Sequence, residues 1–327
     1  MTLDVYILTY NRSKYLKEAI DSVLNQTYTD FDLYVIDNCS TDNTQEMVAE
    51  YTDSRVHYYR QPTNVGSFKN FTFAITHCKA DFFVLFHDDD IMLPNMLEKE
   101  IEILSGNEEL AAVSGNSIIF DEINTSERLY NKCMPKRYAG NEIIRDYIRQ
   151  SKTLVYPSIM YRNSFMKKTG ILPNENAGPC ADVILYSDIA LAGGIIYEMN
   201  DVVMKTRFHP AQDSEVNCFP MRIQLYEFLS TDEKYSSIYK ESVDGRKKSF
   251  DRIMRLILKM ASKSDMTVDE MKHYKKEFNR VFLLKNRHSI WTFMVDAYCC
   301  FPKIMKPIYS ILFNAYVGLK RFYDTAF

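Results

Sequence analysis

The chain has 327 residues, of which 46% are apolar and 25% are charged, and its formal net charge is −3. This composition supports a full hydrophobic core and argues against disorder. The charge is distributed unevenly, because residues 245–327 contain 17 Lys and Arg against 7 Asp and Glu, a net charge of +10 that leaves −13 for residues 1–244. The basic C-terminal part therefore favours an anionic surface or partner.

The cysteine pattern and the absence of long apolar runs bear on the compartment. Seven cysteines are scattered along the chain without a C-x-x-C pair, which favours reduced thiols in a cytosolic chain and disfavours a zinc site. The N-terminal residues lead straight into a strand pattern, so we expect no secretion signal. No window contains the roughly 20 uninterrupted apolar residues of a membrane span.

The first third of the chain alternates strands and helices. Strands are expected at residues 5–8, 33–36, 56–59 and 81–86, and helices at 15–24, 42–51, 67–77 and after Pro94, which is expected in a first helical turn. Repeated β-α-β units with apolar strands predict a parallel, doubly wound sheet.

The remainder is predicted to be mixed and then helical. We expect strands at residues 111–120, 156–161 and 195–200, and helices at 141–150 and 182–192. Beyond residue 217 the sequence favours helices, among them the basic amphipathic segment 252–261 and the aromatic segment 303–323.

Polar residues follow three of the expected strands, at 9–12, 37–38 and 88–90. Ligands of such sheets bind outside the carboxyl ends of the strands, so we expect one cleft there. The chain contains neither G-x-G-x-x-G after its first strand nor G-x-x-x-x-G-K-[ST], which disfavours dinucleotide and P-loop sites.

The residues Asp88, Asp89 and Asp90 form a run of like charge that a cation would neutralise. Carboxylates suit Mg²⁺ or Mn²⁺, ions that commonly hold substrate phosphates. A solvated turn that caps the next helix is the alternative interpretation.

Four segments, in order, resemble the motifs of family 2 glycosyltransferases with the GT-A fold. They are V-Y-I-L-T-Y-N-R at 5–12, L-Y-V-I-D-N-C-S-T-D-N-T at 33–44, N-V-G-S-F-K-N-F at 64–71 and F-H-D-D-D-I-M-L-P at 86–94. The resemblance extends over about Leu3 to Ser214. It implies an α/β fold with a doubly wound, mostly parallel, Rossmann-like sheet. It also implies a nucleotide-sugar-binding half at 1–115, an acceptor-binding half at 116–216 and a helical C-terminal region at 217–327.

The resemblance implies a UDP-sugar donor and residues that contact it. Thr9 and Tyr10 match the loop against the base, with Tyr10 stacking on it, and Arg12 lies nearby. Asp37 matches the carboxylate that accepts the uracil N3–H, and Lys69 approaches the base or a phosphate. Asp37 could instead be only a turn residue, and Lys69 a solvated lysine on a helix.

The family's metal motif often has the form D-x-D-D-x-x-x-P. Alignment on Pro94 places His87 at the first carboxylate, implies a contact of Asp88 with the ribose or the metal, and makes Asp89 the principal ligand of Mn²⁺ or Mg²⁺. Asp90 then binds the metal directly or through water. The pairing of Asp88 with Asp90 as the two ligands remains open.

The segment N-A-G-P-C-A-D-V-I-L-Y-S-D-I-A-L-A-G-G at 176–194 resembles the family's E-D-x-x-L-x-x-R-L-x-x-x-G. It implies that Asp182 is the base that takes a proton from the acceptor hydroxyl, while the metal stabilises the departing diphosphate. Ala181 replaces the usual first acid, and Asp188 stands near the usual basic position. T-R-F-H-P-A-Q-D-S at 206–214 resembles the family's R-x-H segment, so Arg207 is expected at the diphosphate and His209 at the diphosphate or the metal.

The resemblance therefore implies an inverting enzyme that moves one sugar to a glycan or lipid-linked acceptor in bacterial surface-polysaccharide assembly. The Q-x-x-R-W signature of processive synthases is absent. We expect a cytoplasmic protein, peripheral on the inner face of the membrane or oligomeric through its C-terminal helices, and no nucleic-acid partner.

Two alternatives are weighed against this function. A sugar-1-phosphate nucleotidyltransferase should have a glycine-rich loop after its first strand, yet residues 9–12 contain no glycine. An inactive GT-A scaffold that binds nucleotide sugar is favoured only by Ala181.

Overall fold

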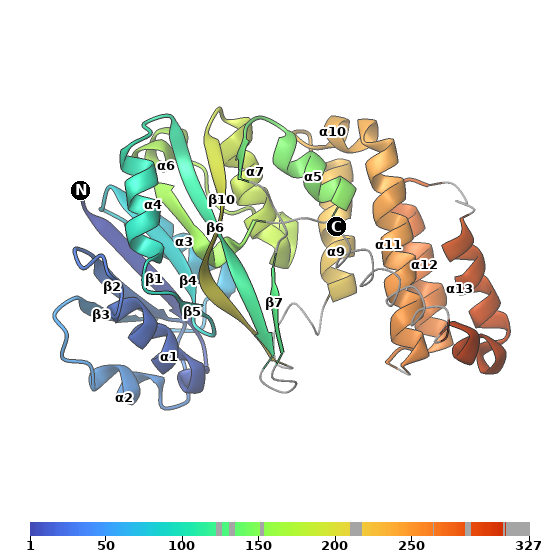
Figure 1. The fold of residues 1–327 in the computed structure, drawn as a ribbon, viewed down its shortest axis with the longest axis horizontal. Coiled ribbons are helices and arrows are strands. Elements are labelled where there is room, and N and C mark those ends of the chain that lie inside the picture. Colours follow the sequence, from blue (N-terminus) through green and yellow to red (C-terminus); the bar gives the residue numbers. More distant parts are fainter. Residues whose placement is uncertain are drawn as a thin grey trace, which may run out of the picture. The chain divides into compact units, whose positions relative to one another are not determined.

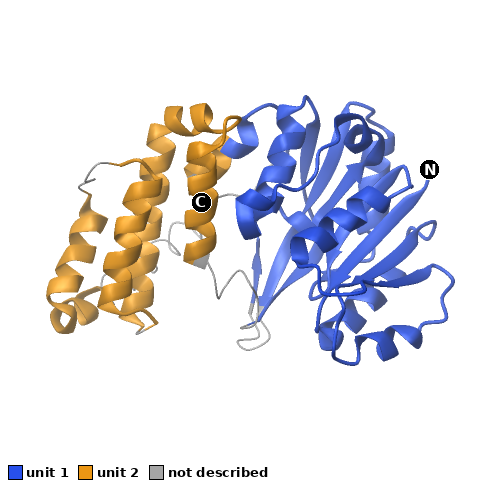
Figure 2. Cartoon of the chain, turned by 180° about the vertical axis from the view of Figure 1, so that it is seen from behind, with its two compact units in different colours: residues 1–144, 153–218 blue, residues 145–152, 219–327 orange. Residues whose placement is uncertain are grey.

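The computed structural model describes residues 1–121, 126–130, 135–150, 154–209, 218–263, 265–284, 289–309 and 311 (Figure 1). The chain divides into two compact units, of which unit 1 comprises residues 1–144 and 153–218 and unit 2 comprises residues 145–152 and 219–327 (Figure 2). The functional division at residues 115 and 216 stays a prediction.

Unit 1 contains the parallel strands that the alternating pattern predicts. They are β1 (Leu3–Thr9), β2 (Asp32–Asp37), β3 (Val56–Arg60) and β4 (Phe82–His87). They lie in the order β3-β2-β1-β4 and all neighbours are parallel. Thr9 is in register with Asp37, and Leu8 with His87. The carboxyl ends of these strands therefore meet at one edge of the sheet, as expected from the sequence.

Helices cover both faces of this part of the sheet. The helices are α1 (Ser13–Leu24), α2 (Thr44–Ala49), α3 (Ser67–His77) and α4 (Met96–Ser105). Apolar residues of α1, α2 and α4 share one core cluster with alternate residues of β1, β2 and β4. Tyr58 of β3 packs against that cluster, whereas Tyr59 points the opposite way and stacks on Phe73 of α3 at 4.6 Å. The predicted doubly wound arrangement is confirmed.

The second half of unit 1 is more irregular than its sequence pattern indicates. Its strands are β5 (Ile91–Met92), β6 (Leu110–Asp121), β7 (Ser126–Leu129), β8 (Lys136–Tyr138), β9 (Ile159–Arg162) and β10 (Ile195–Phe208). β9 is antiparallel to both β4 and β6, while β10 is parallel to β6 and antiparallel to β5. β10 continues past residue 200 because register shifts between Glu198 and Met204 absorb its polar interruption.

Short helices connect these strands. They are α5 (Glu142–Gln150), η1 (Tyr156–Ser158), α6 (Asn163–Thr169), η2 (Glu175–Cys180) and α7 (Ala181–Leu191). Residues 183–190 of α7 are all buried, so this helix passes through the protein interior. The expectation that Pro94 lies in a helical turn is wrong. α4 begins at Met96, and the carbonyl of Pro94 instead accepts the Thr27 N–H at 2.7 Å.

Unit 2 is helical, as predicted. It contains residues 145–150 of α5, together with α9 (Cys218–Thr231), α10 (Ser236–Glu241), α11 (Val243–Ser262), α12 (Val268–Val281) and α13 (Ile290–Cys300). Capping boxes begin α12 at Thr267 and α13 at Ser289. Much of the predicted aromatic segment 303–323 lies outside the described residues. Within the described part of the chain, no helix combines the length and the apolar character that crossing a bilayer requires.

Candidate active site

The loops after β1 and β2 are joined by hydrogen bonds. Asn11 has a φ of 54°, in the left-handed region that asparagine tolerates better than most residues. Its N–H donates to Ser40 Oγ at 2.9 Å, and its Oδ1 accepts the Thr41 N–H at 2.7 Å. Ser40 Oγ in turn donates to Asp37 Oδ1 at 2.6 Å. The two strand ends therefore form one framework.

Asp37 is the fully buried centre of this framework, with 0% of the residue exposed. Its Oδ1 also accepts the Ser40 N–H at 2.8 Å, and its Oδ2 accepts the Tyr58 hydroxyl at 2.6 Å. Arg60 Nε lies 3.5 Å from the same Oδ2. Both carboxylate oxygens therefore have partners within the protein, so a uracil N3–H would have to share or replace one of them. The contact with uracil stays a prediction.

The other residues predicted to contact the nucleotide lie around this framework. Thr9 is buried at the end of β1, whereas Tyr10 is 41% exposed. Lys69 is exposed in the first turn of α3. The loop before α3 is held to the end of β2, because Asn38 Oδ1 accepts the Val65 N–H at 2.9 Å.

The acidic turn 88–90 is buried, and the guanidinium group of the sequence-distant Arg12 lies beside it. Arg12 Nη1 lies 3.2 Å from Asp88 Oδ1 and 3.1 Å from Asp89 Oδ2. Burial raises the pKa of the Asp88 carboxyl to about 6, although the charge of Arg12 lowers it. Burial also raises the pKa of Asp90, against the lowering effect of His87. The structure thus brings Arg12 to the acidic turn.

Arg207 and His209 reach the same turn from the end of β10. The Arg207 N–H donates to Asp90 Oδ1 at 2.9 Å, and its Nε donates to the Asp89 carbonyl at 2.8 Å. Its Nη2 lies 2.5 Å from Glu18 Oε2. His209 Nε2 lies 3.1 Å from Asp89 Oδ2. Both side chains are buried, so they fix the turn. Their predicted contacts with the diphosphate and the metal stay predictions.

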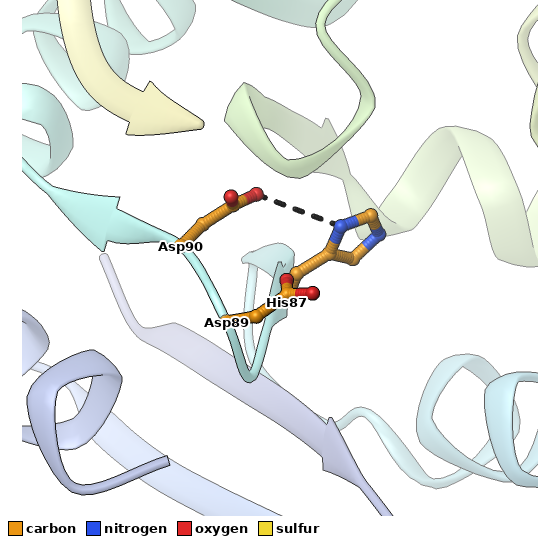
Figure 3. A group of neighbouring side chains, drawn as sticks. All are labelled: His87, Asp89 and Asp90. Carbon is orange, nitrogen blue, oxygen red and sulfur yellow. Dashed lines mark ion pairs between the residues drawn. The ribbon is translucent and has the colours of Figure 1, made fainter. Parts of the chain in front are cut away.

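Three side chains at the end of β4 could hold a divalent cation (Figure 3). His87, Asp89 and Asp90 each offer one ligand atom, and these atoms lie within 4.8 Å of one another. Asp90 Oδ2 is buried and makes no hydrogen bond within the described residues. It lies 3.6 Å from His87 Nδ1. Ligand atoms about 2.1 Å from one ion lie within about 4.2 Å of one another. The group fits a cation after a small side-chain adjustment.

Asp182 lies in the first turn of α7, directly after the η2 segment. Gly178 in that segment has a φ of 67° and a ψ of −150°, which only glycine adopts readily. Burial raises the pKa of Asp182 to about 6, and the nearby charge of His87 lowers it. The sequence-distant Asp182 is therefore an electrostatic neighbour of the residue that ends β4.

His87 and Tyr156 also lie at the end of β4, although the sequence motifs gave neither residue a role in the site. The His87 ring is 5.7 Å from the Tyr156 ring. The Tyr156 hydroxyl is buried and has no hydrogen-bond partner in the described part of the chain. Partial burial lowers the pKa of His87, but the Asp90 carboxylate beside it raises that pKa to about 9. Alignment on Pro94 drew attention to His87, whereas no sequence signal pointed to Tyr156.

Residues 4–170 match the family described as Glycosyl transferase family 2. This match covers half of the chain and includes the carboxyl ends of β1, β2, β3 and β4. The chain belongs to family 2 of the glycosyltransferases. The family and the transferase class expected from the four motifs are thus confirmed.

Relatives of this family 2 glycosyltransferase come from distant organisms. An uncharacterised glycosyltransferase of Rickettsia typhi is 27% identical over 235 residues, which are 69% of this chain and 70% of the relative. An uncharacterised glycosyltransferase of Methanocaldococcus jannaschii is 29% identical over 170 residues, which are 51% of this chain and 57% of the relative. Escherichia coli WfgD, a UDP-Glc:α-D-GlcNAc-diphosphoundecaprenol β-1,3-glucosyltransferase, is 29% identical over 40% of this chain and 54% of its own.

Solved structures support the GT-A fold of this glycosyltransferase. S. aureus TarS in complex with UDP matches with a TM-score of 0.60 at 15% identity, over 86% of this chain and 81% of TarS. The mannosyltransferase PcManGT from Pyrobaculum calidifontis, in complex with GDP-Man and Mn²⁺, matches with a TM-score of 0.54 at 14% identity, over 94% and 86% of the two chains. At these identities the likeness extends to the fold alone.

Proposed function

We propose that this glycosyltransferase transfers one sugar from a UDP-sugar to a hydroxyl of a glycan or lipid-linked saccharide, with inversion, in surface-polysaccharide biosynthesis. The observation that carries the proposal is the proximity of Asp182 to the end of β4. Asp182 is a half-buried carboxylate whose pKa is raised to about 6 by desolvation and lowered by the nearby charge of His87, the last residue of β4, as suits a base opposite a leaving group. UDP in TarS and the UDP-Glc named for WfgD support the choice of donor.

The proposed chemistry is a single displacement. Asp182 takes the proton of the acceptor hydroxyl as that oxygen forms a bond to the anomeric carbon. The bond between that carbon and the diphosphate oxygen breaks, and its electron pair leaves with the diphosphate. Attack from the face opposite the leaving group inverts the configuration at the sugar carbon.

The donor is held by the residues at the strand ends. Tyr10 stacks on the base next to Thr9 and Asp37, Asp88 contacts the ribose, and the cations Arg12, Lys69 and Arg207 face the diphosphate or stabilise the turn beneath it. Asp89, Asp90 and a histidine would hold Mn²⁺ or Mg²⁺, and such an ion would supply positive charge to stabilise the departing diphosphate. The Mn²⁺ in PcManGT supports the choice of cation.

Transfer and hydrolysis assays test this function across a panel of nucleotide sugars and saccharide acceptors with Mn²⁺. We expect turnover with a UDP-sugar, an inverted anomeric centre by NMR, and loss of about 10²–10⁴-fold in kcat in Asp182→Asn. Glu175→Gln, which changes an exposed acid just before α7, is the matched control. A protein that binds UDP and turns over none of these substrates would instead be the scaffold.

Exposed apolar side chains of unit 2 support the proposal that the protein docks on the inner face of the cell membrane. Apolar side chains are exposed on α13 and on the residues that follow it: Ile290, Phe293, Phe301, Ile304, Ile308 and Ile311. We call these residues the C-terminal apolar strip. Lys303 and Lys306 are exposed within it. Exposed apolar side chains with cationic side chains close to them in the sequence suit an anionic bilayer, where a lipid-linked acceptor would be presented.

Liposome flotation tests this docking with the full chain. We expect flotation with anionic vesicles, weaker flotation of Lys303→Glu/Lys306→Glu, and loss in Phe293→Ser/Ile304→Ser. Leu172→Ser, at an exposed leucine of unit 1, should float like the unchanged protein. Equal flotation of all variants would refute membrane docking. A dimer that the double serine variant abolishes would assign the strip to a second copy of the chain.

A further inference from the structure

We infer that His87 is a nitrogen ligand of the divalent cation and that it makes the site select Mn²⁺ over Mg²⁺. The inference rests on the proposed function for the use of the cation. It goes beyond that function by assigning a ligand and a metal preference.

The position of His87 in the fold aims its ring at the acidic turn. It is the last residue of β4, and its Nδ1 faces Asp90 Oδ2 at 3.6 Å (Figure 3). Half of the His87 side chain is exposed, so an ion can reach it from solvent. Around one ion with bonds of about 2.1 Å, neighbouring octahedral ligands are about 3.0 Å apart and opposite ones about 4.2 Å. The observed separation lies between these values and is longer than an ordinary hydrogen bond.

The second observation comes from Asp90, which is 1% exposed. Its Oδ1 accepts the Arg207 N–H, whereas its Oδ2 is buried without a hydrogen-bond partner among the residues described. A buried carboxylate oxygen without a hydrogen bond is costly, and the ion pair with His87 Nδ1 at 3.6 Å is too long to be one. A cation held between this oxygen and His87 Nδ1 would replace that long contact with two metal–ligand bonds.

His209 differs from His87 in its surroundings. Its Nε2 is already at hydrogen-bond distance, 3.1 Å, from Asp89 Oδ2, and its side chain is buried. Its ring lies 4.9 Å from the ring of Tyr15. We therefore infer that His209 orients Asp89 through this hydrogen bond, as outer hydrogen-bond partners orient metal-bound carboxylates.

The ligand set determines the preferred ion. Mg²⁺ favours oxygen ligands and gives up its water reluctantly, whereas imidazole suits transition ions. One imidazole with two carboxylates should therefore favour Mn²⁺ over Mg²⁺. Replacement of His87 by a carboxylate should reduce that preference.

Electron spin echo envelope modulation of bound Mn²⁺ tests the assignment without an activity assay. The probes are Mn²⁺ alone and Mn²⁺ with UDP, added to the full chain. We expect nitrogen-14 modulation in the unchanged protein, its loss in His87→Gln and His87→Asp, and its retention in His209→Gln. His77→Gln, which changes an exposed histidine at the end of α3, is the matched control. Circular dichroism and thermal unfolding verify that each variant folds.

Metal affinity gives a second readout. Titration should show Mn²⁺ binding at least about tenfold weaker in His87→Gln, and an approximately tenfold smaller preference for Mn²⁺ over Mg²⁺ in His87→Asp. Modulation that survives both His87 variants would overturn the inference, and its loss in His209→Gln alone would assign the ligand to His209. Nitrogen-bound Mn²⁺ without sugar transfer would refute only the proposed function. Transfer without a nitrogen signal would refute only the present inference.

Discussion

Two groups of buried carboxylates lie at one edge of the sheet, and they are paired in different ways. Asp37 at the end of β2 is closed by hydrogen bonds from its own loop and from Tyr58 of the next strand. The turn 88–90 at the end of β4 is contacted by Arg12, Arg207 and His209 from distant segments. It nevertheless keeps one buried oxygen, Asp90 Oδ2, that makes no hydrogen bond within the described structure and lies 3.6 Å from its ion-pair partner, His87 Nδ1. A carboxylate whose two oxygens are both hydrogen-bonded by nearby residues stabilises the framework. A carboxylate with one oxygen that lacks a hydrogen bond is suited to bind a ligand.

The largest effect is expected at the open turn. Asp89→Asn removes a charge that faces both Arg12 and His209, so metal-dependent UDP binding should be lost and transfer should fall about 10²–10³-fold. Calorimetric titration of UDP with and without Mn²⁺ measures the binding. Asp30→Asn, in an exposed loop, is the control. Unchanged metal dependence in Asp89→Asn would assign the principal ligand to another residue.

The next effect concerns pH. A base must be deprotonated, and burial raises the pKa of Asp182 to about 6. We therefore expect kcat/KM to rise with pH up to about 6 and to level off above it, with about a tenfold loss for each pH unit below. Initial rates at a fixed Mn²⁺ concentration give the profile. A profile that stays flat down to pH 5 would show that another group takes the proton.

A smaller effect, on stability, is expected at the closed carboxylate. Asp37→Asn keeps the shape of the side chain but weakens charge-assisted hydrogen bonds, which should lower the free energy of unfolding by about 2–3 kcal/mol. Thermal unfolding monitored by circular dichroism measures this change. If Asp37 serves only the nucleotide base, the melting temperature will stay constant and only the KM for the donor will rise.

The smallest effect is expected at Glu100, a third kind of buried carboxylate. It is fully buried on α4, and neither of its oxygens has a hydrogen-bond partner within the described ranges. Burial raises its pKa well above the ordinary value. The folded protein therefore holds this proton more tightly than the unfolded chain, and the associated stability is lost as the pH rises above the unfolded pKa of about 4.5.

Glu100→Met removes the unpaired group at similar volume. We expect it to raise the free energy of unfolding by about 1–2 kcal/mol at neutral pH and to remove this pH-dependent loss. Melting temperatures at pH 5 and pH 8 provide the test, with exposed Glu102→Met on the same helix as the control. A destabilised Glu100→Met would indicate that the carboxyl group has a partner after all.

The sequence predicted the parallel part of the sheet well because each apolar strand there is bounded by polar turns and followed by a helix. It missed β5, β7 and β8, which are short and depend on pairing with β6 or β10. The family motifs led to Asp88, Asp89, Asp90 and Asp182. No local pattern indicated that Arg12 bridges two of the aspartates or that Tyr156 stands beside His87, because those contacts join residues more than 60 positions apart.

The short strand β5 has a consequence for ion binding. It follows Asp90 directly and pairs with β10 through Ile91 and Met92, and the next N–H, that of Leu93, donates to the Val203 carbonyl at 2.9 Å. The acidic turn is therefore anchored in the sheet on both sides, by β4 before it and β5 after it. Little backbone entropy remains for a cation to remove. Ion capture should then be rapid and accompanied by a small heat-capacity change, unlike the capture of an ion by a loop that must first fold around it.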